Sequence, residues 1–315
     1  MKQYILKSQF LILVVCLLLL ISVSADAAFL YLEPSDGEHY LGDTFIVGVR
    51  IDTQNECINT VEANLSFSKD VLDVIDFSGG NSILTLWLQK PIIDNNSGII
   101  SFAGGVPGGY CGRLSGDSGE SNLLGKIIFK VKQGGQGWVK FLNTSQVLLN
   151  DGLGTQAKVN TADAAFILRS AVATTSQDNW TKERAEDTIM PESFLMEISR
   201  DPSIFEGKYF ISFSTQDKQT GIDRYEVLET RDRRQETGDK QQEIWKKTES
   251  PYLLEDQTLS SIIKVKAIDK AENERIAEYI PKKEKAPFPY WIIIWIILAF
   301  GAAGVVWRIA KRFIK

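Results

Sequence analysis

Apolar and polar residues alternate with a period of two over much of residues 28–158. Phe45, Val47, Val49 and Ile51 are each separated by one position, so they would line one face of a strand. Comparable strand patterns occur at 61–67, 71–75, 83–88, 98–102, 123–131 and 138–142. Turn-forming residues at 95–98 and 133–137 separate several of these runs. Short strands joined by such turns predict an all-β sandwich over residues 28–160.

A second group of strand patterns predicts a separate, smaller β-sandwich over residues 191–281. The candidate strands are 194–198, 208–214, 222–228, 243–247 and 261–268. Between the two units, 161–190 is interpreted as a short helix followed by a linker, with Thr161 as the helix N-cap and residues 160–168 as the helical stretch. The charged run at 231–242 is typical of an exposed hairpin loop.

The start of the chain has the three parts of a secretory signal peptide. Lys2 and Lys7 precede an apolar run at 10–21, and Ala25 and Ala27 form a small-residue cleavage site. An uncleaved membrane helix is the alternative, although the apolar run is short for a full span. We therefore expect residues 1–27 to be a removed signal peptide.

The end of the chain predicts a membrane anchor. Residues 288–307 carry no charge over a length that crosses a bilayer, and aromatic residues such as Trp291 and Trp307 lie near both ends. The tail 308–315 is basic, which favours a cytoplasmic position. The expected location is a cell membrane, with a single transmembrane helix, the bulk of the chain extracellular and the C-terminus cytoplasmic.

Composition bears on which activities and partners are expected. The net charge of −5 does not favour nucleic acid as a partner. His39 is the single histidine, so a catalytic set that pairs a nucleophile with a histidine could use only this residue. The Gly-rich stretch 104–109 lacks the Lys-Ser/Thr ending of a phosphate-binding loop, and glycines in 151–163 stand where a calcium loop needs oxygen ligands. We expect no enzyme activity, no cofactor and no metal ligands.

The three cysteines are Cys16, Cys57 and Cys111, and the first lies in the predicted signal peptide. An even number left in an exported protein favours a disulfide between Cys57 and Cys111. Two free thiols or a metal pair remain open as alternatives.

Aromatic side chains in the first unit are the candidate ligand-binding residues. Trp87 would share a strand face with Thr85 and Gln89, opposite a leucine-lined face, and Trp138 would share its face with Lys140. Tyr110 lies beside Cys111. Flat aromatic faces suit both sugar rings and protein contacts, while packing against neighbouring loops is the structural alternative for each of them.

Several segments of the first unit resemble the bacterial cohesin domain. They are GDTF at 42–45, NTVEA at 59–63, LSF at 65–67, IISFAGG at 99–105 and VLLNDG at 147–152. The resemblance covers residues 30–158 and implies a nine-stranded jelly-roll sandwich, related in fold to cellulose-binding modules, that docks to dockerin. GIDRYEV at 221–227 and VKAIDKAEN at 265–273 resemble immunoglobulin-like or fibronectin type III-like repeats, which commonly act as spacers.

These patterns together predict a membrane-anchored, surface-displayed, non-catalytic binding module. The partner would be a protein, either dockerin-like or another surface protein; binding of polysaccharide by the same sandwich and a structural role in the cell envelope are the alternatives. A row of coplanar exposed aromatics on one sheet would favour sugar. A flat face of mixed polar and apolar residues would favour protein.

Overall fold

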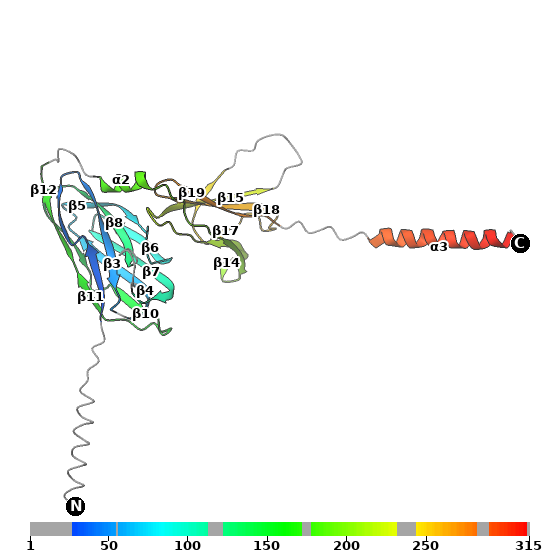
Figure 1. The fold of residues 1–315 in the computed structure, drawn as a ribbon, viewed down its shortest axis with the longest axis horizontal. Helices are drawn as coiled ribbons and strands as arrows, with labels where there is room; N and C mark the ends of the chain where they lie inside the picture. The colour runs from blue at the N-terminus through cyan, green and yellow to red at the C-terminus, as the bar shows by residue number, and fades with distance from the viewer. Residues whose placement is uncertain are drawn as a thin grey trace, which may run out of the picture.

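The computed structural model describes residues 27–54, 56–112, 122–171, 178–231, 244–281 and 290–313. Two β-rich units follow one another along the chain, and helix α2 (Asn179–Glu186) lies across their junction (Figure 1). The predicted signal peptide lies outside the described residues, apart from Ala27, and so does most of the predicted loop at 231–242.

Twelve strands make up the first unit within the part of the chain that the structure describes. They are β1 (Ala28–Glu33), β2 (Asp36–Tyr40), β3 (Thr44–Asp52), β4 (Ile58–Phe67), β5 (Leu72–Ser78), β6 (Leu86–Asp94), β7 (Ile99–Tyr110), β8 (Leu123–Val131), β9 (Gly135–Phe141), β10 (Gln146–Leu149), β11 (Val159–Ala162) and β12 (Ala164–Arg169). The predicted all-β sandwich is confirmed, but it holds more than the nine strands that the cohesin resemblance implies.

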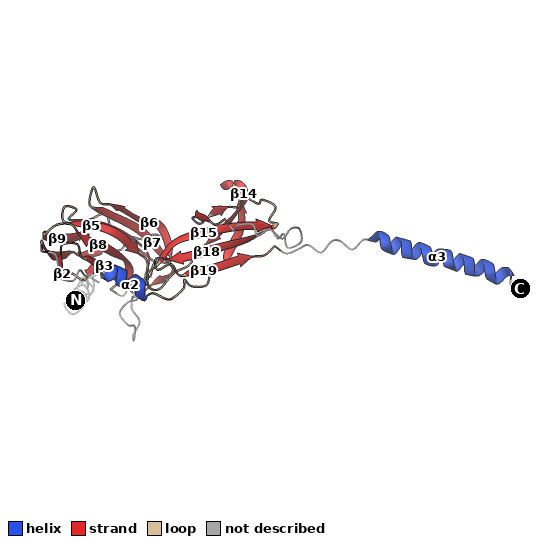
Figure 2. Cartoon of the chain, turned by 90° about the horizontal axis from the view of Figure 1, so that it is seen from above, coloured by secondary structure: helices blue, strands red, loops and turns tan. Residues whose placement is uncertain are grey.

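These strands form two sheets that face each other (Figure 2). One has the order β11-β1-β3-β8-β5, and the other has the order β2-β12-β9-β4-β7-β6, with β10 also paired to β4. Most neighbours are antiparallel, but β1 pairs with β11 and β2 pairs with β12 in parallel. The two strands that begin the unit are therefore each paired with one of the two strands that end it, one pair in each sheet.

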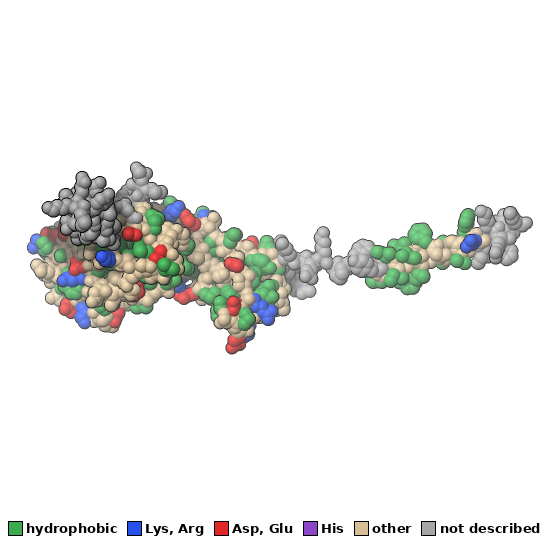
Figure 3. Space-filling model, turned by 90° about the horizontal axis from the view of Figure 1, so that it is seen from below, with side chains coloured by type: hydrophobic (Ala, Val, Ile, Leu, Met, Phe, Trp, Pro, Cys, Tyr) green, Lys and Arg blue, Asp and Glu red, His purple; other side chains and the backbone are tan. Residues whose placement is uncertain are grey.

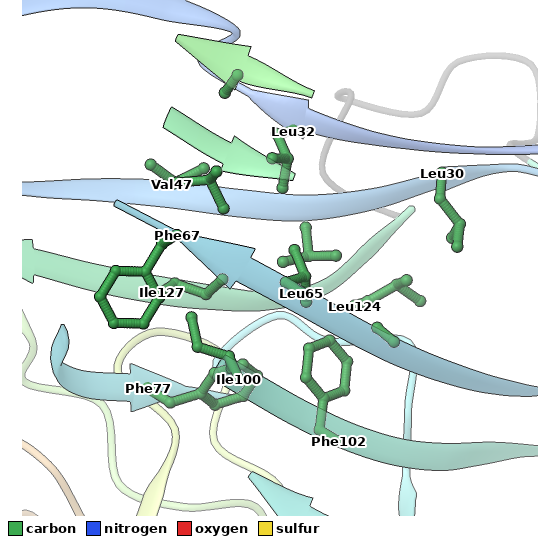
Figure 4. Packing of buried hydrophobic residues seen from close by; sticks show 14 of the residues in the cluster. Leu30, Leu32, Val47, Leu65, Phe67, Phe77, Ile100, Phe102, Leu124 and Ile127 are labelled. Carbon is green, nitrogen blue, oxygen red and sulfur yellow. The ribbon is translucent and has the colours of Figure 1, made fainter. Parts of the chain in front are cut away.

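The core of the first unit is filled from both sheets (Figure 4). Phe45 and Phe129 enter from the five-stranded sheet, and Phe102 and Phe166 enter from the other; each is at most 2% exposed. Ring contacts such as Phe45–Phe166, with centroids 5.0 Å apart, link the two layers. Burying a side chain of this size contributes roughly 1.5–3 kcal/mol, so the core is the main stabilising feature of the unit.

The second unit is smaller and also consists of two sheets. Its strands are β13 (Met196–Asp201), β14 (Ile204–Phe213), β15 (Ile222–Arg231), β16 (Lys246–Thr248), β17 (Tyr252–Leu253), β18 (Ser261–Asp269) and β19 (Glu274–Tyr279). The sheet orders are β13-β14-β17 and β16-β15-β18-β19. Ile211, Val227 and Val265 are at the centre of its core, against which Tyr225 packs.

The helix predicted at 160–168 is wrong, because this stretch forms β11 and β12. In β12, Ala164, Phe166 and Leu168 are buried while the residues between them are exposed. That period of two fits a strand between β9 and β2, and this pairing extends the first unit to Arg169. The helix lies instead in the predicted linker, as α2, where the Asp178 side chain accepts a hydrogen bond from Thr181 N.

The predicted disulfide between Cys57 and Cys111 is confirmed. Cys57 immediately precedes β4 and Cys111 immediately follows β7, and Ile58 is paired with Tyr110 across the two strands. The disulfide therefore links the adjacent ends of two neighbouring strands.

Helix α3 (Tyr290–Phe313) overlaps the predicted anchor at 288–307. Within the described residues, no helix is found that is both long and apolar enough to cross a membrane. The transmembrane prediction is therefore not confirmed.

Substitutions in β12 test whether this segment belongs to the core of the first unit. We expect Phe166→Ala to lower the free energy of unfolding by about 3–5 kcal/mol, because a fully buried ring leaves a cavity. Ile167→Ala, the next residue, should change it by less than about 0.5–1 kcal/mol, because Ile167 is 51% exposed. Urea unfolding of the two variants measures both values, and similar losses in both would contradict the assignment.

Candidate binding surface

The outward face of β4, β7 and β6 is a continuous surface of mixed polarity. The inward residues Val61, Ala63 and Leu65 of β4 are fully buried, so the residues between them point outward. The register of the three strands places these outward side chains in rows. We call this the β4–β7–β6 face and define it by Thr60, Glu62, Asn64, Leu86, Gln89, Ile92, Ser101 and Ala103.

Hydrogen bonds hold several polar side chains of this face in place. Gln89 Nε2 donates to Ser101 Oγ over 2.9 Å, across the β6–β7 pair. Asn64 Nδ2 donates to Glu62 Oε1 over 2.9 Å and to Thr144 O over 3.2 Å. Side chains that are already ordered lose less conformational entropy when a partner binds. The polar part of the face is therefore pre-organised.

Strand β6 adds exposed apolar side chains at the edge of the sheet. Leu86, Leu88 and Ile92 are 51%, 61% and 57% exposed. Lys90 and Pro91 interrupt the same strand, and charged residues and proline are features that protect an edge strand from unspecific pairing. The β4–β7–β6 face thus ends in an apolar margin formed by Leu86, Leu88 and Ile92. Lys90 and Pro91 disfavour pairing of another strand with this edge.

Trp87 does not lie on this face, so the predicted arrangement of β6 is wrong. Its ring contacts Phe77 and Phe102 with centroids 6.0 and 6.1 Å away, and it packs against the core, whereas Leu86 and Leu88 are exposed. The reason is that β6 contains irregularities on both sides of Gln89, which break simple alternation.

The other two predicted aromatics are far apart in the sheet arrangement. Trp138 is half-buried on the outer side of β9, and Lys140 Nζ lies 5.3 Å from its ring centroid, so the two share a face as predicted. Tyr110 is at the end of β7, half-buried against the core. The structure therefore does not bring Trp87, Tyr110 and Trp138 together into a row of coplanar rings.

His39 is placed as a packing residue. Its ring stacks on Phe45 with centroids 3.9 Å apart and an interplanar angle of 9°. Burial lowers the pKa of His39, and the nearby Asp43 carboxylate opposes this effect. The imidazole is thereby favoured in its neutral form and belongs to the aromatic cluster with Phe166.

A groove of about 1170 Å³ separates the β6 side of the first unit from the second unit. Its walls include Leu86, Trp87 and Pro91 on one side and Phe213, Tyr225 and Lys247 on the other. Lys90 Nζ and Glu249 Oε1 are 2.6 Å apart and connect its two sides. The groove therefore adjoins the apolar margin of the β4–β7–β6 face.

The floor of the groove is held by contacts centred on Asp76. Its carboxylate accepts hydrogen bonds from Trp180 Nε1 over 3.2 Å and from Lys270 Nζ over 2.6 Å. Arg184 Nε donates to Lys270 O over 2.7 Å. A residue of the first unit, helix α2 and the second unit are joined here in one polar network.

Backbone also approaches backbone closely at the same junction. Ser78 Oγ donates to Thr220 O over 2.6 Å, and both residues are fully buried. A Cβ added at Gly80 would lie 2.0 Å from Gln219 O. The close approach therefore requires glycine at position 80.

Charged side chains of both signs are interspersed over the face of the two units shown in Figure 3. Asp94, at the end of β6, accepts hydrogen bonds from Ser97 Oγ and from the backbone nitrogens of Ser97 and Asn96. These bonds lower the pKa of Asp94, so its carboxylate stays negatively charged to a lower pH beside the β4–β7–β6 face.

Among the described residues, Asp187, Asp217 and Asp269 form a group able to hold a metal ion.

No protein-family model matches this sequence, and no curated protein matches it. The chain is similar to solved structures of cohesins. A type I cohesin of Pseudobacteroides cellulosolvens has 14% identity and a TM-score of 0.38, covering 48% of this chain and 97% of the cohesin. A type I cohesin–dockerin complex of Clostridium thermocellum gives 11% identity and a TM-score of 0.38, covering 48% and 99%. A cohesin of Clostridium acetobutylicum gives 14% identity and a TM-score of 0.37, covering 48% and 96%.

These cohesins belong to the family that the sequence motifs of the first unit resemble. Similarity at 11–14% identity assigns neither a ligand nor a partner to this chain. The choice of a binding surface therefore rests on the residues described above.

Gly80→Ala tests the close contact between the units. We expect the added methyl group to push the two units apart, because no side-chain movement can relieve a clash with the backbone oxygen of Gln219. Small-angle scattering of the full-length chain should show a larger radius of gyration. Gly105→Ala is the matched control, since its Cβ would meet its nearest atom, Asn59 O, at 3.4 Å. Equal radii for both variants would contradict the close contact.

Proposed function

We propose that this protein is a non-catalytic binding module that docks a protein partner on the β4–β7–β6 face. The observation that carries the proposal is the composition of that face, where exposed apolar Leu86 and Ile92 of the edge strand β6 border an ordered polar area. Protein interfaces combine apolar anchors with hydrogen-bonding groups in this way.

The placement of Trp87 favours protein over polysaccharide as the partner. A sugar-binding face needs exposed rings in one plane, and Trp87 instead packs against Phe77 and Phe102. Trp138 is the aromatic residue that supports the polysaccharide alternative, because it lies on the outer side of the same sheet. The cohesin resemblance of the sequence makes a dockerin-like module the first protein to test.

The Cys57–Cys111 disulfide supports a location outside the reducing cytosol. We propose that the module is exported and that the second unit, whose described strands form two sheets, is an immunoglobulin-like spacer that positions the first. The polar network at Asp76 supports a spacer held firmly against the binding unit.

Introducing a charge into the apolar margin tests the proposed surface. We expect Ile92→Arg to weaken capture of the partner at least tenfold, because burying an unpaired guanidinium in an interface costs more than about 1.4 kcal/mol. Ile167→Arg is the matched control, since Ile167 has similar exposure but lies on β12 of the same sheet. Thermal unfolding should be similar for both variants.

The measurement uses the immobilised full-length chain, probed with dockerin modules, with culture-supernatant proteins and on a glycan array. Dissociation constants for each captured protein are compared among the wild type and the two variants. Binding to glycans alone, or protein capture that Ile92→Arg leaves unchanged, would contradict docking on the β4–β7–β6 face.

A further inference from the structure

Three aspartates from separate segments meet at the end of the second unit that faces the first. Asp187 ends helix α2, Asp217 lies in the loop between β14 and β15, and Asp269 ends β18. Their exposed fractions are 4%, 3% and 0%. One carboxylate oxygen from each lies within 4.8 Å of those of the other two.

Hydrogen bonds from the surrounding chain fix the orientation of each carboxylate. Asp187 Oδ2 accepts from Thr220 N over 3.1 Å and from Thr220 Oγ1 over 2.6 Å. Asp217 Oδ2 accepts from the backbone nitrogens of Gln219 and Gly221. Asp269 accepts from the backbone nitrogens of Ala271 and Asn273 and from Asn273 Nδ2. The three groups are thus held in place before anything binds.

One oxygen of this cluster lacks a partner. Asp217 Oδ1 is buried and has no hydrogen-bond donor within the part of the chain that the structure describes. A buried carboxylate oxygen without a donor or a counter-charge is destabilising, so native structures rarely retain one without a reason. A cation bound at the cluster would supply the partner that this oxygen lacks.

Among the residues that the structure describes, no cationic side chain pairs with the cluster. The nearby Lys270 pairs with Asp76 and Asp223, and Arg184 and Arg275 donate to backbone oxygens of Lys270 and Pro191. Within the described residues no ion pair reaches Asp187, Asp217 or Asp269. The protein alone therefore does not compensate this negative charge.

We propose that Asp187, Asp217 and Asp269 bind a calcium ion. All three ligands are carboxylate oxygens, the donors that this hard cation prefers, and neither histidine nor cysteine belongs to the cluster. When three oxygens all lie within 4.8 Å of one another, there is a point within about 2.8 Å of all three, close to the Ca–O distance of roughly 2.3–2.6 Å. Backbone oxygens and water would complete the coordination.

An ion bound by the three aspartates would lie next to the contact between the first and second units. Asp187 belongs to the segment that follows α2, and its hydrogen-bond partner Thr220 is the residue whose carbonyl accepts from Ser78 of the first unit. Asn273 Nδ2 donates to Asp187 O over 3.2 Å, which ties this segment to the turn after β18. Calcium would therefore hold α2 and the second unit in the arrangement that forms the groove.

Calorimetric titration of the full-length chain, purified in mild detergent and stripped with EDTA, tests the proposal. We expect CaCl₂ to bind with a stoichiometry of one ion per chain. Calcium at about one hundred times its dissociation constant should raise the midpoint of thermal unfolding by roughly 5–10 °C. Mg²⁺ at the same concentration should give a smaller rise, because it accepts fewer geometries and loses its water reluctantly.

The variant Asp217→Asn tests whether Asp217 is a calcium ligand or has only a structural role. This variant should lose calcium binding, and without calcium its unfolding midpoint should equal or exceed that of the wild type, because one uncompensated charge is removed. Asp201→Asn is the matched control: Asp201 is an exposed turn aspartate of the same unit that accepts from Ser203 N, and its replacement should leave calcium binding unchanged. A wild-type midpoint that calcium and EDTA leave unchanged, or equal calcium binding by Asp217→Asn and the wild type, would overturn the proposal.

Discussion

The contact between the 78–80 and 219–221 segments is the constraint on which the arrangement of this molecule depends. Ser78 and Thr220 form a buried hydrogen bond, and Gly80 allows the two backbones to approach without side chains between them. Contacts of this kind leave the two units little freedom to slide against each other, because a buried polar group that loses its hydrogen-bond partner cannot bond to water instead. The position of the second unit and the groove between the units depend on this contact, and the aspartate cluster lies beside it.

Helix α2 has a larger structural role than a linker would have. Trp180 is 4% exposed and donates to Asp76, and Lys126 forms an ion pair with Glu183, so the first unit binds the helix. Asp187 and Arg184, at the other end of the helix, contact the second unit. Two units joined in this way present the β4–β7–β6 face in a defined orientation rather than at the end of a loose tether.

Strand positions in the first unit could be predicted because burial alternates along them, as in Val61, Ala63 and Leu65. The same rule failed at Trp87, because irregular pairing around Gln89 exchanges the two faces of β6 and no single-residue signal marks a bulge. The helix predicted at 160–168 had a plausible cap in Thr161, but pairing with β9 and β2 outweighed this local preference.

The aspartate cluster could not be predicted from the chain, for a different reason. Each of its members looks like an ordinary turn or cap residue when only its neighbours in sequence are considered. They meet only after the linker helix and two loops of the second unit are in place. Sites built from distant segments leave no spacing pattern, in contrast to a contiguous calcium loop.

The parallel pairings at the two ends of the first unit have a mechanical consequence. Strand β1 runs alongside β11, and β2 runs alongside β12, each pair in the same direction. A force applied between Ala28 and Arg169 would pull these neighbours lengthwise past each other, so that the evenly spaced bonds of each ladder share the load. A domain closed in this manner resists stretching by shear, whereas a terminal hairpin would open one bond at a time.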